Sequence, residues 1–291
     1  MAKKPNFLKN LLTTASALAV VTGAANAYAV DVISHTGPAV FSTGANFKTG
    51  GANLGGVVAA GTNVISGGAF ALTLDRAGEF GSLNVYGNNT AITVTTASSF
   101  TSIVNDVTAT ATAAALAAKG IAQAAGGTPA AKANFTIGAG GAFTFNAIDA
   151  LGTVTFADAA AKATFAGDNT TVTGAIIGNV GNFGTVVVDA TNVTFSGNIG
   201  VAGTAIDQFK IIDGKSATLD ANLVANGAVT IGSGAVGGVL NVNGGKNITT
   251  AGDIVGSAAN KGKINFGGDS VVTTGAAAGI GGGVALEEIN I

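Results

Sequence analysis

The chain has 291 residues, a formal net charge of −2 and only 10% charged residues, against about 25% in an average soluble domain. Although 47% of its residues are hydrophobic, no apolar run reaches the roughly 20 residues of a membrane-spanning helix. A helical membrane protein and a charge-solvated disordered chain are therefore both excluded. The chain has no cysteine and one histidine, so it lacks the residues for thiolate chemistry and for a site with two imidazoles. Its lysines are scattered, so it lacks the basic patch by which proteins bind nucleic acid.

Residues 1–27 have the pattern of a secretory signal peptide. Three lysines precede an apolar stretch at 11–25, and small residues follow it, so we predict cleavage after Ala27 or Ala29. A retained membrane anchor is the alternative, but the apolar stretch is short and is interrupted by threonine and serine. We expect export to the cell surface, the outer membrane or the periplasm.

Short alternating runs of apolar residues and threonine fill the segments 30–105 and 134–291. Leu83–Tyr86 and Val193–Phe195 are examples, and glycine, asparagine or aspartate closes most runs. A period of two with β-branched and aromatic residues predicts strands, and the closing residues predict turns. Successive runs start mostly seven to eleven residues apart, which fits a sandwich, a barrel or a parallel solenoid.

An internal repeat favours the solenoid. Gly167–Gly178 aligns with Gly245–Gly256, and 152–156 aligns with 227–231 after a short indel. Runs this short are stable when each coil stacks its apolar edge on the next. We predict an all-β fold, a right-handed parallel β-helix (β-solenoid), with an N-terminal β-rich segment at 30–105 and an open-ended repeat region at 134–291.

The segment 106–133 departs from this pattern because it is rich in alanine. Asp106 can cap a helix, alanine favours one, and Gly-Gly-Thr-Pro at 126–129 would end it. We predict a short helical insertion between two solenoid stretches. A coil turn rich in alanine and threonine is the competing interpretation.

Motifs that could carry chemistry are isolated. His35 is the only imidazole, and Arg76 is the only guanidinium. Gly232–Gly237 matches a dinucleotide-binding pattern by letter, but the next segment has a strand pattern, so no helix N-terminus would hold a pyrophosphate. Gly267-Gly268-Asp269 and Gly167-Asp168 resemble half of a calcium-binding repeat that needs several tandem copies.

The acidic residues are spread about one per turn and are expected at corners, where aspartate bonds backbone groups. They are Asp149, Asp158, Asp168, Asp189, Asp207, Asp213 and Asp220. We therefore predict no catalytic, cofactor or metal residues, no small-molecule substrate and no nucleic-acid partner. A β-helix enzyme that acts on polysaccharides is the alternative, and it would need clustered acids and bases on one face.

The opening nonapeptide Met-Ala-Lys-Lys-Pro-Asn-Phe-Leu-Lys and the turns in Val193–Gly200 and Gly174–Asn182 resemble the rickettsial surface cell antigens, the outer membrane protein A and B autotransporters. The similarity covers the signal and, more diffusely, the repeats from about Gly138 to Gly275. It implies a passenger domain on the surface of an obligate intracellular bacterium, which adheres to a host-cell surface protein and serves as a surface antigen in virulence.

Members of that family are much longer and end in a translocating barrel of roughly ten-residue strands. This chain shows no such pattern and stops at Leu286–Ile291, within what resembles another strand. We therefore expect an adhesin-like or antigenic passenger without enzymatic activity. A truncated, non-functional remnant of a longer passenger is the alternative.

Overall fold

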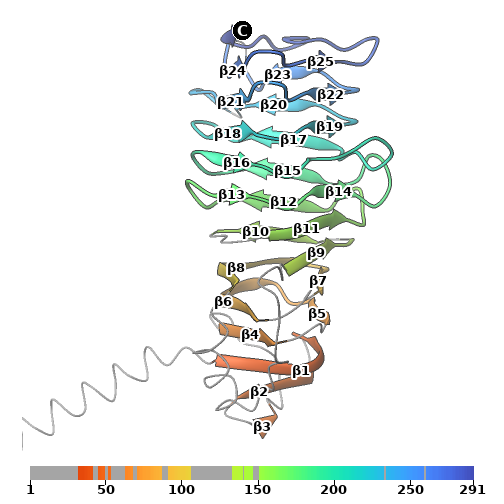
Figure 1. The fold of residues 1–291 in the computed structure, drawn as a ribbon, viewed down its shortest axis with the longest axis vertical. Coiled ribbons are helices and arrows are strands. Elements are labelled where there is room, and N and C mark those ends of the chain that lie inside the picture. The colour runs from red at the N-terminus through yellow and green to blue at the C-terminus, as the bar shows by residue number, and fades with distance from the viewer. Residues whose placement is uncertain are drawn as a thin grey trace, which may run out of the picture. The chain divides into compact units, whose positions relative to one another are not determined.

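The structure is a computed structural model. It describes residues 32–41, 45–49, 52–53, 63–67, 71–86, 91–105, 133–139, 141–146, 151–232, 234–258 and 260–291. Within these residues every regular element is a strand, and most neighbouring strands pair in parallel (Figure 1). The chain winds into a β-solenoid whose successive coils are joined by backbone hydrogen bonds, which confirms the predicted fold class. The predicted signal peptide at 1–27 lies outside the described residues.

From residue 142 onward the coils have three walls, which the chain visits in a fixed order. The first wall contains β10 (Ala142–Phe145), β12 (Lys162–Phe165), β15 (Thr185–Val188), β17 (Gln208–Ile211), β20 (Val229–Ile231) and β23 (Ile254–Gly256). The second contains β13 (Thr171–Val172), β16 (Val193–Phe195), β18 (Ser216–Leu219), β21 (Val239–Val242), β24 (Lys263–Phe266) and β26 (Glu288–Asn290). The third contains β11 (Leu151–Phe156), β14 (Ile176–Gly178), the bridging residue Ile199, β19 (Leu223–Ala225), β22 (Ile248–Thr250) and β25 (Val272–Thr273).

The N-terminal coils use longer strands. β6 (Gly78–Tyr86) and β8 (Ala97–Asn105) each run along the first wall and continue past its corner, while β5 (Ala71–Leu74), β7 (Ala91–Val94) and β9 (Ala133–Ile137) extend the third wall. β1 (Val32–Val40) pairs in parallel with β4 (Asn63–Gly67) and β5. One local exception to parallel pairing occurs here, because β2 (Ala45–Thr49) is antiparallel to both β1 and β3 (Ala52–Asn53).

The stack continues across the alanine-rich segment. Residues 106–132 lie outside the described part of the chain, so the predicted helix at 106–133 is not described, except that Ala133 belongs to β9. The strands on either side stack directly, since β9 pairs with β7 and β10 pairs with β8. The hydrogen-bonded ladders therefore connect the strands that precede this segment directly with those that follow it.

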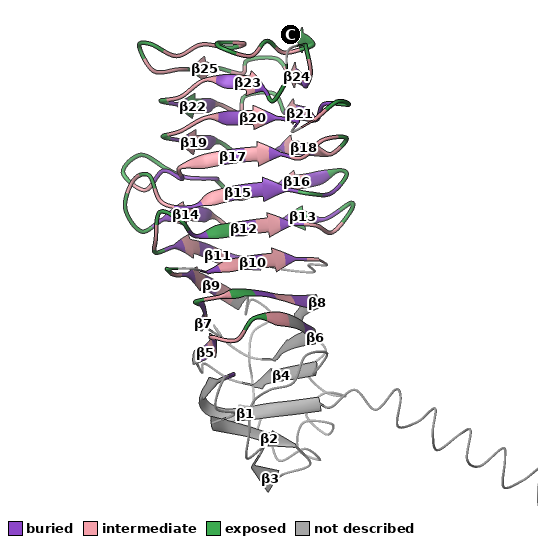
Figure 2. Cartoon of the chain, turned by 180° about the vertical axis from the view of Figure 1, so that it is seen from behind, coloured by how far each residue is buried: buried purple, intermediate pink, exposed green. Residues whose placement is uncertain are grey.

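Buried residues recur in the strands of successive coils (Figure 2), and their side chains form one hydrophobic core along the solenoid. Alternate residues of most strands are buried, as the period of two predicts. Aromatic rings form a continuous series with centroids 4.6 to 6.0 Å apart, and aliphatic residues fill the ladders beyond it. The rings of this series are Phe80, Phe100, Phe143, Phe145, Phe165, Phe195 and Phe209.

The sequence repeat does not correspond to whole coils. On the second wall, Thr171 stacks under Thr194, Thr218 and Asn241 in turn, so Asn241 lies three coils further along. The repeat instead aligns Thr171 with Thr249, which lies beyond Asn241 in the chain and belongs to β22 on the third wall. One copy of the repeat is therefore longer than three coils by about the length of one wall. Accordingly, β15 on the first wall aligns with β24 on the second, and β16 on the second wall aligns with β25 on the third.

Candidate functional site

The isolated motifs do not come together. The backbone of His35 lies in β1, in register with Phe47 of β2 and Ser66 of β4. Gly232 and Gly237 have φ angles of +82° and +81° in the turn between β20 and β21, so a strand follows this glycine pattern, as predicted. Among the described residues, no three histidine or acidic side chains form a group that could hold a metal ion.

Several acidic residues lie at corners, as predicted, but their main hydrogen bonds join neighbouring coils. The Asp168 carboxylate accepts a 2.7 Å bond from the backbone N–H of Thr191, and Asp213 accepts a 3.0 Å bond from that of Val236. Asp158 instead accepts locally, from the N–H of Ala160 at 2.8 Å. These carboxylates act as acceptors for backbone donors and thereby hold the corners in register.

Two asparagine ladders were missed by the sequence reasoning. In the first, the side-chain oxygens of Asn198, Asn222 and Asn247 each accept a bond of 2.9 to 3.2 Å from a backbone N–H of the next coil. In the second, the amide of Asn265 donates to Asn241 at 2.7 Å, and Asn290 donates to Asn265 at 2.7 Å. Asparagines spaced by one coil length are the signal that could have revealed both ladders.

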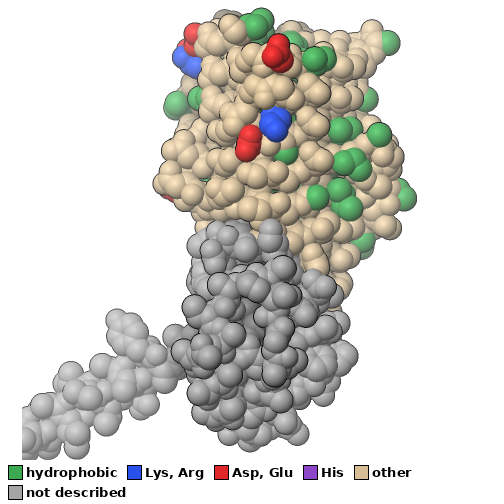
Figure 3. All heavy atoms as spheres, viewed as in Figure 1, with side chains coloured by type: hydrophobic (Ala, Val, Ile, Leu, Met, Phe, Trp, Pro, Cys, Tyr) green, Lys and Arg blue, Asp and Glu red, His purple; other side chains and the backbone are tan. Residues whose placement is uncertain are grey.

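The outward rows of the walls are largely uncharged. The second wall presents three threonines followed by three asparagines in one stacked row, and the third wall presents Thr73, Thr93, Thr136 and Thr155. In the view of Figure 3, only a few acidic and basic side chains interrupt the described surface. Such walls can form many weak hydrogen bonds.

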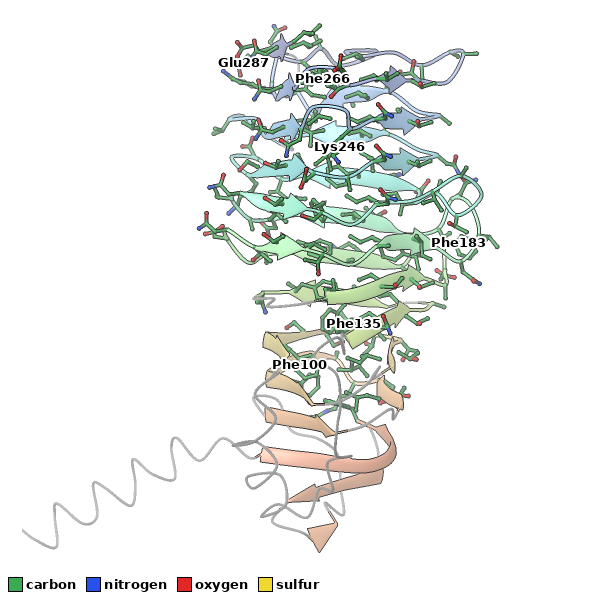
Figure 4. The ribbon with its side chains drawn as sticks, viewed as in Figure 1. Phe100, Phe135, Phe183, Lys246, Phe266 and Glu287 are labelled. Carbon is green, nitrogen blue, oxygen red and sulfur yellow. The ribbon has the colours of Figure 1, made fainter. Side chains whose placement is uncertain are left out.

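A shallow groove of about 340 Å³ lies where the first and second walls meet in the last coils, beside Lys215, Val236 and Lys263. The Lys263 ammonium lies 3.2 Å from Glu288 and 3.4 Å from Glu287, the residue labelled at the end of the solenoid in Figure 4. The hydrogen bond from Lys263 to Glu288 is the main cause that raises the pKa of Lys263 and lowers the pKa of Glu288. This charge cluster joins β24 to β26 and its carboxylates already neutralise the lysine.

In two adjacent coils the connection from the third wall to the first is longer than in the two coils that follow, and in the second of them Ile206 still pairs with Ala225 of the third wall. Three residues connect β19 to β20 and β22 to β23, whereas residues 179–184 connect β14 to β15 and residues 200–207 lead from Ile199 to β17. We call residues 179–183 and 200–204 the corner bulge. The backbone N–H of Gly178 donates to Thr204 at 3.0 Å, so the two corners are tied together.

The corner bulge is apolar and uncharged. Val180 is 49% exposed and Val201 is 39% exposed, while Phe183 is partly buried against the core. Figure 3 shows hydrophobic side chains gathered on the edge where the loops after β14 project in Figure 1, with no acidic or basic side chain among them. Sequence reasoning missed this surface because it considered strands and charged motifs rather than corner lengths.

No protein-family model, curated protein or solved structure shows a significant match to the chain. In the part of the chain that the structure describes, no helix is long and apolar enough to cross a membrane. The candidate functional surfaces therefore rest on geometry alone: the uncharged walls, the shallow groove and the corner bulge.

Proposed function

We propose that this chain is an exported surface protein that works by binding rather than catalysis, as an adhesin-like or antigenic module. The observation that carries the proposal is the form of its surface. The described residues build a stack of coils with largely uncharged walls, and several acidic side chains at the corners accept hydrogen bonds from backbone donors. Broad walls and projecting corners favour contact with a large partner, such as a protein on another cell, over enclosure of a small substrate.

The pattern of residues 1–27 supports export, and the resemblance to autotransporter passengers supports a place on the bacterial surface. A solenoid suits that place because each added coil extends the exposed walls without requiring a larger core.

Protease treatment of intact bacteria tests the location. The chain should be digested on intact cells, and its N-terminus should begin just after Ala27 or Ala29. Digestion only after the outer membrane is made permeable would place the chain in the periplasm and overturn the surface assignment. Absence of the chain from cells that transcribe its gene would favour a passenger remnant.

Adhesion tests the binding role. Beads coated with the purified full chain should attach to host cells in greater number than beads coated with an unrelated acidic protein. Pretreatment of the host cells with a protease should remove the attachment, because the proposed partner is a surface protein. Equal attachment of both bead types would contradict an adhesive role.

A further inference from the structure

The chain contains two Asn-Gly pairs, and both lie at corners of the solenoid. Asn226–Gly227 lies in the corner between β19 and β20, and Asn243–Gly244 lies in the corner between β21 and β22. Asparagine before glycine is chemically labile, because the backbone nitrogen of a residue without Cβ can reach the side-chain carbonyl carbon of the preceding asparagine. Asn226 and Asn243 are both exposed, so water reaches each of them.

The two glycines differ in what their backbone groups bind. The N–H of Gly227 donates to the carbonyl of Asp207 at 2.6 Å, and its carbonyl accepts a 2.7 Å bond from the Thr250 hydroxyl. Within the described residues, the N–H of Gly244 has no protein acceptor, and Gly244 lies exposed in a turn. The nitrogen of Gly227 is therefore held against a neighbouring coil, whereas no such bond restrains the nitrogen of Gly244.

We propose that Asn243–Gly244 is a site of spontaneous modification, at which asparagine converts to isoaspartate and aspartate, while the fold protects Asn226–Gly227. The Gly244 nitrogen loses its proton to water and forms a bond to Cγ of Asn243. The Cγ–Nδ2 bond breaks, and the side-chain nitrogen takes up a proton and leaves as ammonia. Water then opens the five-membered succinimide ring at either carbonyl, so each conversion consumes one water and releases one ammonia.

The modification changes this corner, which Lys246 marks in Figure 4, in two ways. The side-chain amide of Asn243 donates to the Asp220 carboxylate at 3.3 Å, so an acid at position 243 replaces this attraction by repulsion between two carboxylates. In isoaspartate the main chain also runs through Cβ and Cγ, which lengthens the corner by one methylene. The former main-chain carbonyl, which accepts from the Lys246 N–H at 3.1 Å and the Ser270 hydroxyl at 3.2 Å, becomes a carboxylate.

We therefore expect β22, which follows this corner, to loosen from the next coil as copies of the chain age. This inference does not depend on where the chain is delivered or on what it binds, so its failure would leave the proposed function standing.

Incubation of the purified full chain in mildly alkaline buffer tests the proposal. Trypsin cleaves after lysine, so both Asn-Gly pairs fall in one peptide, 216–246, and their conversion is compared at equal recovery. Electron-transfer fragmentation in a mass spectrometer locates each converted residue and separates isoaspartate from aspartate, and a sample taken before incubation corrects for conversion during digestion. In the folded chain, Asn243 should convert about tenfold faster than Asn226, because the Gly227 N–H must first leave its hydrogen bond to Asp207.

Two controls separate the effect of the fold from that of the local sequence. In the urea-unfolded chain the two pairs should convert at similar rates, since no neighbouring coil then holds either glycine. Asn243→Gln keeps a side-chain amide but would have to form a six-membered ring, so it should resist conversion. Its β22 amides should keep their protection from hydrogen exchange through an incubation in which those of the unsubstituted chain lose it.

Equal rates for Asn226 and Asn243 in the folded chain would overturn the proposal. So would conversion of Asn243 to aspartate without isoaspartate, because opening of the succinimide ring yields both. Protection of β22 that stays unchanged once most copies carry isoaspartate would refute the expected loosening of the coil.

Discussion

Phe195 provides a quantitative test of the inward and outward assignments. Its side chain is fully buried on β16, and its ring lies 5.3 Å from Phe165 and 5.8 Å from Phe209, edge-on to both. Replacement of a buried phenylalanine by alanine costs about 3–5 kcal/mol, of which each edge-to-face contact accounts for about 0.5–1.5 kcal/mol. Phe195→Leu keeps most of the volume and loses the ring contacts, so we expect a loss of about 1–2 kcal/mol.

Thr194 is the matched control because it precedes Phe195 on the same strand and points to the opposite side. Thr194→Ala should change stability by no more than about 0.5 kcal/mol. Native-state hydrogen exchange is the suitable assay, since a coil in a stack can open with its neighbours rather than with the whole chain. Protection should fall most at β16 and at the adjacent β13 and β18. A larger loss for Thr194→Ala than for Phe195→Ala would refute the assigned register.

The remaining predictions concern a corner glycine, an asparagine ladder and the charge cluster. Gly184→Ala should lower the free energy of unfolding by more than about 2 kcal/mol, because φ is +82° and the new Cβ would overlap the ring of Phe156. Gly214→Ala, with a φ of +70° and no atom within 4 Å of the new Cβ, should cost only about 1 kcal/mol in the same urea titration. Asn222→Ala should cost about 0.5–1.5 kcal/mol by removing an acceptor for the next coil, whereas Asn222→Asp, which keeps that acceptor, should cost less in a thermal melt. Attachment of β26 should depend on pH. Glu288, whose pKa is lowered, stabilises the attachment above its ordinary value of 4.5, and this contribution is lost as the pH falls through the lowered pKa. Lys263, whose pKa is raised, stabilises the attachment below its ordinary value of 10.5, and this contribution is lost as the pH rises through the raised pKa. Protection factors of the β26 amides, which compare the measured exchange rate with the intrinsic rate at the same pH, should therefore be highest between those limits. A protection profile unchanged by Lys263→Gln would contradict the assignment.

Much of the fold follows from residue patterns that depend on one strand at a time. Apolar residues alternating with threonine identified Val193–Phe195, because each side of this strand has one chemical character. Gln208–Ile211 was missed, although Phe209 and Ile211 are fully buried, because glutamine and lysine occupy its outward positions. Short strands with polar outward residues become recognisable only when their partners in the adjacent coils are known.

The candidate surfaces were harder to predict because they arise from pairs of coils. The long sequence repeat masked the much shorter length of one coil, and without the coil length the asparagine ladders have no visible period. The corner bulge likewise depends on the contrast between its two long corners and the three-residue corners above them. The predicted aspartates that the structure describes lie at corners, while Asp149 lies outside the described residues. The bonds of Asp168 and Asp213 to the following coil could not be inferred from local turn chemistry.

The mismatch between the repeat and the coil has a consequence for how such a molecule diversifies. One copy of the repeat spans three coils and one further wall. Duplication of the repeat therefore moves a pattern of outward residues along the solenoid axis and also onto the next wall. An outward motif that evolves on one side is thereby presented again on the neighbouring side, higher along the axis. The two copies in this chain thus place related outward residues on two neighbouring walls.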